Sequence, residues 1–572
     1  MAVIGIDLGT TNSLASVWRN GRIELIPNTF GEYLTPSVVS FGEDGEVYVG
    51  KVAKERLITA PSVTFAEFKR NMGSSYRYFA NNKYYTAEDL SSFVLRRLKE
   101  DAETYLGEKV TEAVISVPAY FNDDKRCATK NAGKLAGLNI ERLINEPSAV
   151  ALKHHMGVEE AETFIIFDFG GGTLDISLVD AFDNMVEIQA VSGDNYLGGK
   201  DFNEIIAEDF YKDNHITKGD LTEEEQGIIL KEAEMLKREL TDKDKAERKV
   251  YIQNQEYMMR MTNQHLIHVG TELFKRMSIP IRRVINDSGM RLEEIDKLIL
   301  VGGSSKMPVV EQYLKSLLDI SVVRDASPDE SIAEGVGIAA AIKERVGDVK
   351  DMILADICPF SLGTEIFDGS FSPIIERNDT LPCSHTRGYV TMEDYQNTMT
   401  FPIYQGDNMI AKENLLLGTM QITGLPPEPR GKVKASVTFM YDINGILDIK
   451  IVSGEQSLHR VIMNKKMGLS EEELKTRLKQ LREMTLSSME DENTRYLLEK
   501  AQRLYQESPP LVRAHIAEQI TRFRAIMMKE RNARIRREAC VHLSVYLEAV
   551  EYNKFDFNGF DESFFEDDSE EE

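Results

Sequence analysis

The sequence predicts an α/β domain, followed by an antiparallel β-sandwich, a helical region and a short acidic tail. Three observations predict this order. Short apolar strands alternate with amphipathic helices over residues 1–350, which is the pattern of α/β domains. Strand-like runs between turn signals dominate residues 358–468, and helical periodicity takes over in residues 469–552. With 572 residues the chain is too long for one hydrophobic core, so several domains are expected.

One type of loop occurs twice in the α/β region, in IGIDLGTTNS and in FIIFDFGGGTLDIS. The residues of interest are Asp7, Gly9, Thr10, Thr11 and Asn12 in the first copy and Asp168, Gly170, Gly171, Gly172, Thr173 and Asp175 in the second. Each copy predicts a strand, a tight turn and a second strand. Glycine lets the backbone approach a ligand, successive N–H groups bind anions and aspartates hold a hydrated cation. Two facing loops would clamp a polyphosphate and its metal, which predicts an ATPase.

Two further features are consistent with a nucleotide site. A third glycine-rich turn, in LILVGGSSKMP, precedes a predicted helix and contains Gly302, Gly303 and Ser304. One face of another predicted helix could grip ribose and adenine through Glu234, Lys237, Arg238 and Thr241. Taken alone, such a charged stripe is more simply a solvated face.

Two charged residues between these loops are candidates for phosphoryl chemistry. Lys69, in TFAEFKRNMG, is by itself more simply a surface lysine. Glu146, in LINEPSAV, ends a predicted strand, where a carboxylate can orient an attacking water. Phosphoryl transfer needs little more than positioning, charge neutralisation and an oriented nucleophile.

The pattern changes at residues 351–357, a short apolar segment between charges that we interpret as a linker. In the sandwich region, alternation over residues 432–439 is typical of a half-buried strand, and Asn444-Gly445 suits a type I′ hairpin. Ser470 and Glu473 form a capping box before a helix that carries Leu474, Leu478 and Leu481. Residues 553–572 contain nine acidic residues and predict either a disordered solvated tail or an acidic-aromatic docking segment.

The bulk composition excludes several classes of protein. A net charge of −26 argues against a nucleic-acid binder. The N-terminus lacks the basic region of a signal peptide, and no apolar run approaches the about 20 residues that span a bilayer. Four cysteines, Cys127, Cys358, Cys383 and Cys540, are far apart in the sequence and predict reduced structural thiols rather than a disulfide framework or a zinc site. We therefore expect a cytoplasmic protein, and we also expect it to be a monomer.

Together these strings resemble the heat-shock protein 70 (DnaK-type) chaperone family, nearest the bacterial HscC type. The matching motifs in the first domain are GIDLGTTNS, VPAYFND, INEPSAVAL, FDFGGGTLDIS, LGGKDF and LVGGSSKMP, and those beyond it include DMILADICPFSLG and PPEPRG. The loops alone would admit actin-like proteins and sugar kinases, whereas the linker and the sandwich do not. The resemblance implies an actin-like, ribonuclease H-like ATPase domain of two duplicated lobes (1–350), a linker (351–357), a substrate-binding β-sandwich (358–468), a short helical lid (469–552) and an acidic tail (553–572).

The resemblance also implies roles for individual residues of the ATPase domain. ATP, Mg²⁺ and K⁺ would be the cofactors, with Asp7 and Asp175 beside the cations. Catalysis would fall to Lys69, Glu146, Asp168 and Thr173. The nucleotide would be bound by Gly9, Thr10, Thr11, Asn12, Gly170, Gly171, Gly172, Gly198, Gly199, Glu234, Lys237, Arg238, Thr241, Gly302, Gly303, Ser304 and Asp329.

Coupling and peptide binding complete what the resemblance implies. Nucleotide state would be reported through Pro118, Arg126, Arg142, Leu354 and Asp356. An extended apolar peptide would add to the sandwich as a strand, in a cleft lined by Thr364, Phe367, Met392 and Met399. Unfolded polypeptides and a J-domain co-chaperone would be the partners, with ATP controlling peptide capture and release. The alternative from another class is an actin-like or sugar-kinase-like phosphotransferase with an accessory β domain.

The chain departs from the family pattern at several positions. Lys200 follows Gly198-Gly199, where an acid is usual, and Lys306 stands where arginine is common. Ala355 interrupts the usual run of linker leucines, which predicts weaker coupling between domains. Residues 199–234 and 245–271 are compact, so dependence on a nucleotide exchange factor stays open.

Overall fold

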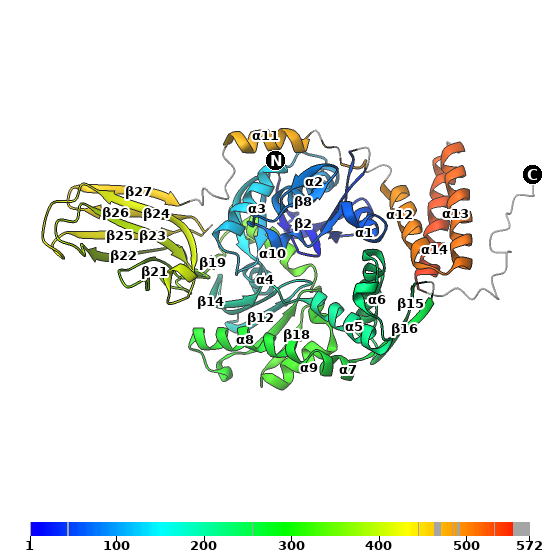
Figure 1. Cartoon of the computed structure of the whole chain (residues 1–572), viewed down its shortest axis with the longest axis horizontal. Coiled ribbons are helices and arrows are strands. Elements are labelled where there is room, and N and C mark those ends of the chain that lie inside the picture. Colours follow the sequence, from blue (N-terminus) through cyan, green and yellow to red (C-terminus); the bar gives the residue numbers. More distant parts are fainter. Residues whose placement is uncertain are drawn as a thin grey trace, which may run out of the picture.

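Figure 1 shows the fold in a computed structural model of the chain. It describes residues 2–42, 45–158, 160–253, 255–443, 445–462, 471–482, 484, 486–488, 492–530 and 532–552. The predictions for the hairpin residue Asn444, the cap residue Ser470 and the tail 553–572 lie outside these residues, as do the side chains of Glu473 and Leu474.

Among the described residues, two six-stranded sheets form the centre of the α/β region, and five strands of each share one order. In each sheet, three consecutive antiparallel strands are joined by two later parallel strands. The sheet of lobe I contains β1 (Val3–Asp7), β2 (Asn12–Arg19), β3 (Arg22–Ile26), β4 (Thr35–Pro36), β10 (Glu112–Val117) and β11 (Asn139–Asn145). The sheet of lobe II contains β12 (Glu162–Phe169), β13 (Leu174–Phe182), β14 (Met185–Asp194), β17 (Lys297–Val301), β18 (Ser321–Arg324) and β19 (Ile353–Ala355). The two similar loops therefore occupy equivalent turns, β1–β2 and β12–β13.

Two helices pack on each other between these sheets. Helix α10 (Ser331–Lys343) lies on β1 and β2, and α4 (Glu146–His155) lies on the sheet of lobe II. Their backbones touch, because a Cβ added to Gly335 would lie 1.8 Å from the carbonyl oxygen of Ala149. Ala149, Val336 and Ile338 belong to a hydrophobic cluster that joins both lobes. This contact fixes where Glu146, the first residue of α4, is placed.

Smaller elements build the outer walls of both lobes. Lobe I adds β5 (Val38–Phe41), β6 (Val47–Val49), β7 (Thr64–Ala66), β8 (Tyr78–Ala80), β9 (Lys83–Tyr85), α1 (Lys51–Thr59), α2 (Ala87–Leu106), α3 (Asp123–Leu135) and the 3₁₀ turns η1 (Pro61–Val63) and η2 (Phe68–Asn71). Lobe II adds α5 (Gly199–Asp213), α6 (Glu223–Glu239), β15 (Lys245–Ile252), β16 (Gln255–Thr262), α7 (Asn263–Val269), α8 (Thr271–Ser288), α9 (Pro308–Leu317), η3 (Lys218–Asp220), η4 (Leu292–Glu294) and η5 (Gly303–Lys306). The turn η6 (Gly347–Val349) leads to the linker.

The linker forms the outermost strand of the lobe II sheet. Strand β19 pairs in parallel with β14, with Ile353, Leu354 and Ala355 opposite Met185, Val186 and Glu187. Leu354 packs against the cluster between the lobes, and Ala355 is buried. The segment that the sequence predicts as a linker is thus held on the α/β region along its length.

The sandwich that follows has two four-stranded sheets among the described residues. One contains β20 (Leu362–Glu365), β21 (Phe371–Ile375), β23 (Thr398–Gln405) and β24 (Leu415–Thr423), and η7 (Ala411–Glu413) precedes β24. The other contains β22 (Cys383–Val390), β25 (Lys434–Tyr441), β26 (Leu447–Ser453) and β27 (Gln456–Ile462). Alternating residues of β25, Ala435, Val437 and Phe439, face the core between the sheets, as their period of two predicts.

The C-terminal helices lie on the α/β region rather than over the sandwich. They are α11 (Glu471–Arg482), α12 (Glu492–Glu507), α13 (Pro510–Lys529) and α14 (Ala533–Glu551). In Figure 1 the sandwich and helices α12–α14 occupy opposite ends of the molecule, with the lobes between them. We call α12–α14 the helical bundle; Leu497, Phe523 and Leu547 belong to its hydrophobic core.

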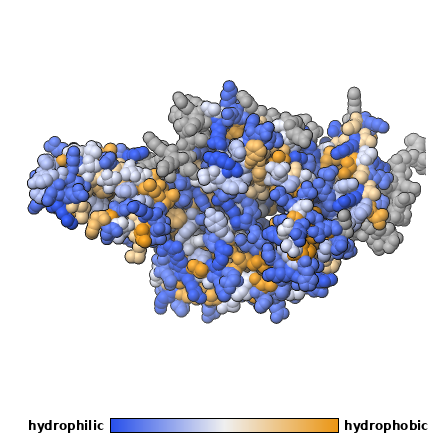
Figure 2. Space-filling view, in the orientation of Figure 1, coloured by the Kyte–Doolittle hydropathy of each residue, from blue (hydrophilic) through white to orange (hydrophobic). Residues whose placement is uncertain are grey.

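The surface agrees with the acidic, polar composition. Figure 2 shows a mostly hydrophilic face on which apolar residues form scattered patches, some of them on the sandwich. On the sandwich, Phe367 and Met409 are 77% and 86% exposed. Their two loops are adjacent, because the N–H of Phe371 donates to the carbonyl oxygen of Met409. Exposed apolar groups gathered in this way are typical of interaction sites.

A buried acid marks the contact between the bundle and lobe I. Asp101 of α2 is 4% exposed, and neither carboxylate oxygen has a hydrogen-bond partner. Burial raises the pKa of Asp101 to about 7; Arg97 opposes this shift, whereas Glu492 of α12 and Glu100 of α2 add to it. Because this pKa exceeds the unfolded value, stability falls as the pH rises from about 4 to about 7.

We expect the variant Asp101→Asn to be more stable than the wild type at pH 8 by on the order of 1–2 kcal/mol, since each pKa unit corresponds to about 1.4 kcal/mol. The neutral amide avoids the buried charge, and the difference should shrink towards pH 4, where Asp101 is protonated and neutral in the folded state. Thermal unfolding followed by circular dichroism between pH 4 and pH 8 measures this. A difference that does not change with pH would contradict the prediction.

Candidate active site

A cavity of about 490 Å³ lies between the two lobes and brings the sequence-predicted residues together. Its volume is in the usual range for small-molecule sites. Predicted residues that line it are Asp7, Gly9, Thr10, Thr11, Asn12, Lys69, Glu146, Asp168, Gly170, Gly171, Thr173, Glu234, Lys237, Arg238, Thr241, Gly302, Gly303, Ser304 and Asp329. Residues far apart in the sequence therefore form one site.

The other predicted glycines, Gly172, Gly198 and Gly199, lie in or beside the glycine-rich loop between β12 and β13. A Cβ on Gly198 would come within 2.4 Å of the Gly172 nitrogen, and the N–H of Gly199 donates to the carbonyl oxygen of Gly170 at 3.0 Å. The two loops also meet, since a Cβ on Gly171 would lie 2.0 Å from Thr11 Oγ1. Side chains would fill the space in which these loops approach each other, which explains the glycine-rich composition.

Lys69 and Glu146 form a buried ion pair inside this cavity. Lys69 Nζ lies 2.6 Å from Glu146 Oε1, and the two residues are 4% and 5% exposed. Lys69 comes from η2 in lobe I, and Glu146 begins α4. The interpretation of Lys69 taken alone as a surface lysine is wrong, because the fold of η2 turns its side chain inward.

Buried carboxylates outnumber cations around this pair. Burial and the charge of Glu146 raise the pKa of Asp7 and that of Asp175 to about 7, and burial with neighbouring carboxylates also raises the pKa of Asp168. Asp175 Oδ1 is buried and has no hydrogen-bond partner in the described chain. A cation would reverse these shifts, and all the donors are oxygens, so the set fits Mg²⁺.

Three further cations lie near the two glycine-rich loops, and of these only Lys200 stands out in the sequence, as a departure from the family pattern. Arg70 donates to the carbonyl oxygen of Gly172 in the opposite lobe. Lys200 pairs with Glu67 at 2.5 Å, also from one lobe to the other. Burial lowers the pKa of Lys125, while Asp175 opposes this shift. The charge of Lys200 could be read from the sequence, but its partner Glu67 depends on how the lobes close.

The polar stripe of α6 lines the cavity, and its Arg238 is also exposed to solvent. Lys237 Nζ donates to the carbonyl oxygen of Gly199 at 2.7 Å, and burial lowers the pKa of Lys237 to about 8. Glu234 pairs with Arg238 at 2.6 Å. Thr241 follows the helix, and Asp329 lies across the cavity, where it pairs with Lys306.

The residues predicted to report nucleotide state gather where the linker meets α4. Asp356 Oδ2 accepts hydrogen bonds of 2.9 Å from Asn145 Nδ2 and from Ser148 Oγ. Arg126 donates to Asn145 Oδ1 at 2.6 Å. Burial lowers the pKa of Arg142, and the charge of Asp356 opposes this shift. Pro118 starts the turn between β10 and α3, where its carbonyl oxygen accepts from the N–H of Phe121.

The four predicted cleft residues of the sandwich do not share one environment. Thr364 is buried and donates to the carbonyl oxygen of Pro402, and Met399 is part of the sandwich core. Phe367 is largely exposed, and Met392 is half-buried just beyond the end of β22. The two predicted cleft residues near the surface therefore lie in loops, and the other two lie inside.

A family model described as Hsp70 protein matches residues 3–83 and 77–544. This chain belongs to the Hsp70 family. The match supports an ATP-dependent chaperone that binds ATP with Mg²⁺ and acts on unfolded polypeptides with co-chaperones. It does not favour the phosphotransferase alternative. No described helix of this Hsp70-family chain combines the length and the apolar character that crossing a membrane requires.

Proposed function

We propose that ATP binding and hydrolysis between the lobes control the capture and release of extended apolar peptide segments by the sandwich. The single observation that carries this proposal is the placement of two consecutive residues. Asn145 bonds to Asp356 of the linker, and Glu146 pairs with Lys69 in the cavity. Because Asn145 and Glu146 are consecutive, a change in the charges around Glu146 can move Asn145. The hydrogen bond of Asn145 to Asp356 would pass this movement to the linker.

Contacts between the sandwich and lobe I support the same coupling. Asp123, at the start of α3, accepts a hydrogen bond from the Tyr441 hydroxyl at 3.1 Å, and its N–H donates to Gln405 Oε1 at 3.1 Å. Phe360, just after the linker, packs edge-on against Tyr120 with ring centroids 4.8 Å apart. Release of the linker would separate these groups, so linker and sandwich are expected to move together.

In this proposal the residues of the cavity act by positioning and charge. Lys69 stabilises charge that develops on the phosphoryl group, and Glu146 and Asp168 orient the attacking water. Asp7 and Asp175 would hold the cations Mg²⁺ and K⁺, which would neutralise phosphate charge when bound. Thr173 and the glycine loops hold the phosphates, and the stripe of α6 with Asp329 holds the nucleoside.

The finer partners belong to the proposal as well. A J-domain co-chaperone would bind near Arg142 and the linker, while Pro118 and Arg126 would report the nucleotide state. Thr364, Phe367, Met392 and Met399 stay proposed cleft residues, and contact of peptide with Thr364 or Met399 requires the sandwich to rearrange because both are buried. We place the chain nearest the cytoplasmic HscC type, acting as a monomer.

Single-turnover ATP hydrolysis with and without an extended apolar peptide tests this function. Coupling between two sites is reciprocal, so peptide should accelerate hydrolysis, and ATP should accelerate release of a fluorescent peptide. A J-domain protein is added in a second series. A hydrolysis rate that peptide does not change, together with a peptide release rate that ATP does not change, would contradict the proposal. Phosphorylation of a small molecule would favour the phosphotransferase alternative.

A further inference from the structure

The helical bundle contacts both lobes, not one. On lobe I, α12 runs along α1, where Arg503 pairs with Glu55, and Glu499 pairs with Arg56 at 2.9 Å. On lobe II, Glu507 pairs with Lys231 of α6 at 2.6 Å. Arg513 of α13 also lies 6.0 Å from the ring centre of Tyr251 in β15. The bundle therefore covers the line along which the two lobes meet.

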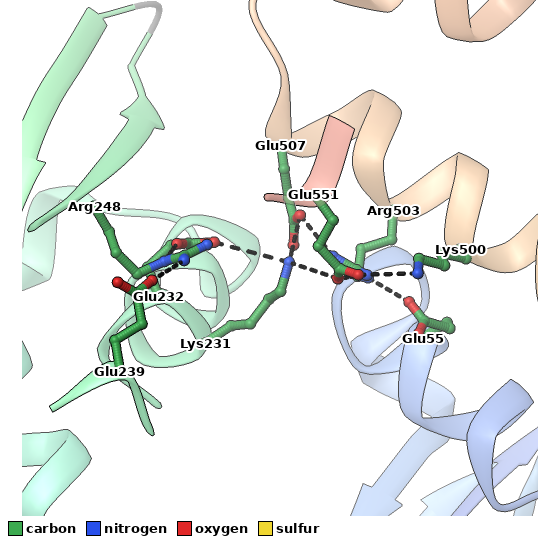
Figure 3. Close-up of polar contacts among 9 residues, drawn as sticks. All are labelled: Glu55, Lys231, Glu232, Glu239, Arg248, Lys500, Arg503, Glu507 and Glu551. Atoms are coloured by element: carbon green, nitrogen blue, oxygen red, sulfur yellow. Dashed lines mark hydrogen bonds and ion pairs between the residues drawn. The ribbon is translucent and has the colours of Figure 1, made fainter. Parts of the chain in front are cut away.

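The ion pairs at this junction form one buried network (Figure 3). Arg503 joins Glu55, Glu507 and Glu551, and its side chain is 5% exposed. Glu551 also pairs with Lys500, whose Nζ lies 2.9 Å from a Glu551 carboxylate oxygen, and with Lys231, whose Nζ lies 3.9 Å from one. Burial alone would raise the pKa of Glu551, but Arg503, Lys231 and Lys500 outweigh it and lower that pKa to about 2. Buried ion pairs are poorly screened by salt, so salt should weaken this junction little.

The network continues into the body of lobe II. Lys231 lies 3.8 Å from Glu232, and Glu232 and Glu239 both pair with Arg248 of β15. Arg248 is 6% exposed. As Figure 3 shows, Lys231 lies between this lobe II group and the acids of the bundle. Lys231 is thus the link between the bundle and a buried part of lobe II.

Of the two helices that the bundle joins, α6 lines the nucleotide cavity and α1 packs against α6. Lys231 precedes the cavity residue Glu234 by three positions, one turn of α6. Lys54 of α1 interacts electrostatically with Glu234, and its neighbours Glu55 and Arg56 bind the bundle. Ile58 of α1 packs into the hydrophobic cluster of lobe II. Because the cavity walls come from both lobes, separating the lobes, and with them α1 from α6, would open the cavity.

We propose that the helical bundle has a second function besides that of a peptide lid: docked across α1 and α6, it holds the cavity closed and slows nucleotide release. This inference rests on the proposed nucleotide site. The restraint is mechanical, because opening the lobes must break the ion pairs of the bundle with lobe I or those with lobe II. Undocking of the bundle removes this restraint and lets nucleotide exchange without a separate exchange factor.

The ion pairs between the bundle and lobe II can be removed while the contacts between the bundle and lobe I stay. On lobe I the bundle and the segment before it also bind Glu46, Thr29 and Arg97. On lobe II, the side-chain contacts of the bundle among the described residues include the pairs of Lys231 with Glu507 and Glu551 and the contact of Arg513 with Tyr251. Substitution of Lys231 therefore removes the ion pairs to lobe II, leaves the Arg513–Tyr251 contact and keeps the bundle attached to lobe I.

The test is the dissociation rate of a fluorescent ATP analogue from the full-length protein, measured by stopped flow with excess unlabelled ATP. We expect release to be faster in Lys231→Ala than in the wild type. It should be faster still in Lys231→Glu, by about tenfold, which corresponds to about 1.4 kcal/mol. The matched control is Lys218→Glu, an exposed lobe II lysine whose nearest acid is 3.9 Å away. It should release nucleotide at the wild-type rate.

A second variant approaches the junction from the bundle. Arg513→Ala removes the contact with Tyr251 and should add to the effect of Lys231→Ala, while circular dichroism reports whether each variant is folded. Equal release rates in the wild type, Lys231→Glu and the double variant would overturn the clamp and leave the nucleotide site intact. Failure of the wild type to bind the analogue would overturn the nucleotide site and the clamp with it.

Discussion

Replacing Lys69 by alanine should lower ATP turnover by about a thousandfold while leaving ATP binding in place. Lys69 is the cation paired with Glu146 among the buried carboxylates of the cavity. A preorganised charge in a site that excludes water contributes about 10²–10³ in rate. The α6 stripe and the glycine loops, which would hold the nucleotide, do not depend on Lys69. Single-turnover hydrolysis and equilibrium binding of a fluorescent ATP analogue separate the two effects.

The control for this experiment is Lys83→Ala, which removes an exposed lysine of β9 in the same lobe. It should hydrolyse ATP at the wild-type rate. Wild-type turnover in folded Lys69→Ala would show that Lys69 is not catalytic, and loss of nucleotide binding in that variant would show that Lys69 acts by binding instead.

Asp356→Asn should reduce the stimulation of ATP hydrolysis by peptide at least about tenfold without abolishing basal hydrolysis. Both Asn145 and Ser148 donate to the same oxygen, Asp356 Oδ2. An asparagine amide keeps one acceptor oxygen but loses the charge, and hydrogen bonds to charged groups are worth about 1.5–3 kcal/mol. The proposed catalytic pair, Lys69 and Glu146, is untouched, so basal turnover should remain.

Asp351→Asn serves as the matched control, because Asp351 is exposed at the start of the same linker. Stimulation by peptide should be unchanged in that variant. Stimulation in Asp356→Asn equal to that of the wild type would mean that the linker is coupled to the cavity by other contacts. The measurement is the ratio of single-turnover rates with and without a saturating apolar peptide.

Much of the fold follows from local patterns. Near-continuous apolar runs such as FIIF in β12 and LILV in β17 predict strands covered on both faces. The repeated Asp–Gly–Thr turn anticipates the equivalent loops of the two lobes. In the sandwich, the alternation of β25 anticipates which side chains enter the core. Each of these signals is carried by residues close together in the chain.

What the sequence could not supply depends on contacts between distant segments. Lys69 has the local setting of a surface residue, and only the closing of lobe I over α4 buries it against Glu146. Glu67 and Lys200 lie 133 residues apart and meet across the cleft. Helical periodicity in residues 492–551 predicts an amphipathic bundle, but the surface that the bundle covers is set by ion pairs with α1 and α6.

The parallel pairing of β19 with β14 has a consequence for the lobe II sheet. While the linker is docked, β19 is the edge strand of that sheet. If the linker leaves, β14 becomes the edge, and the backbone of Met185, Val186 and Glu187 loses its partners on the β19 side while it stays paired with β13. An uncovered edge is a template for pairing with other extended chains. A protein that handles unfolded polypeptides would thus uncover an aggregation-prone surface of its own in each cycle, and the charge of Glu187 on that strand is the type of residue that discourages such pairing.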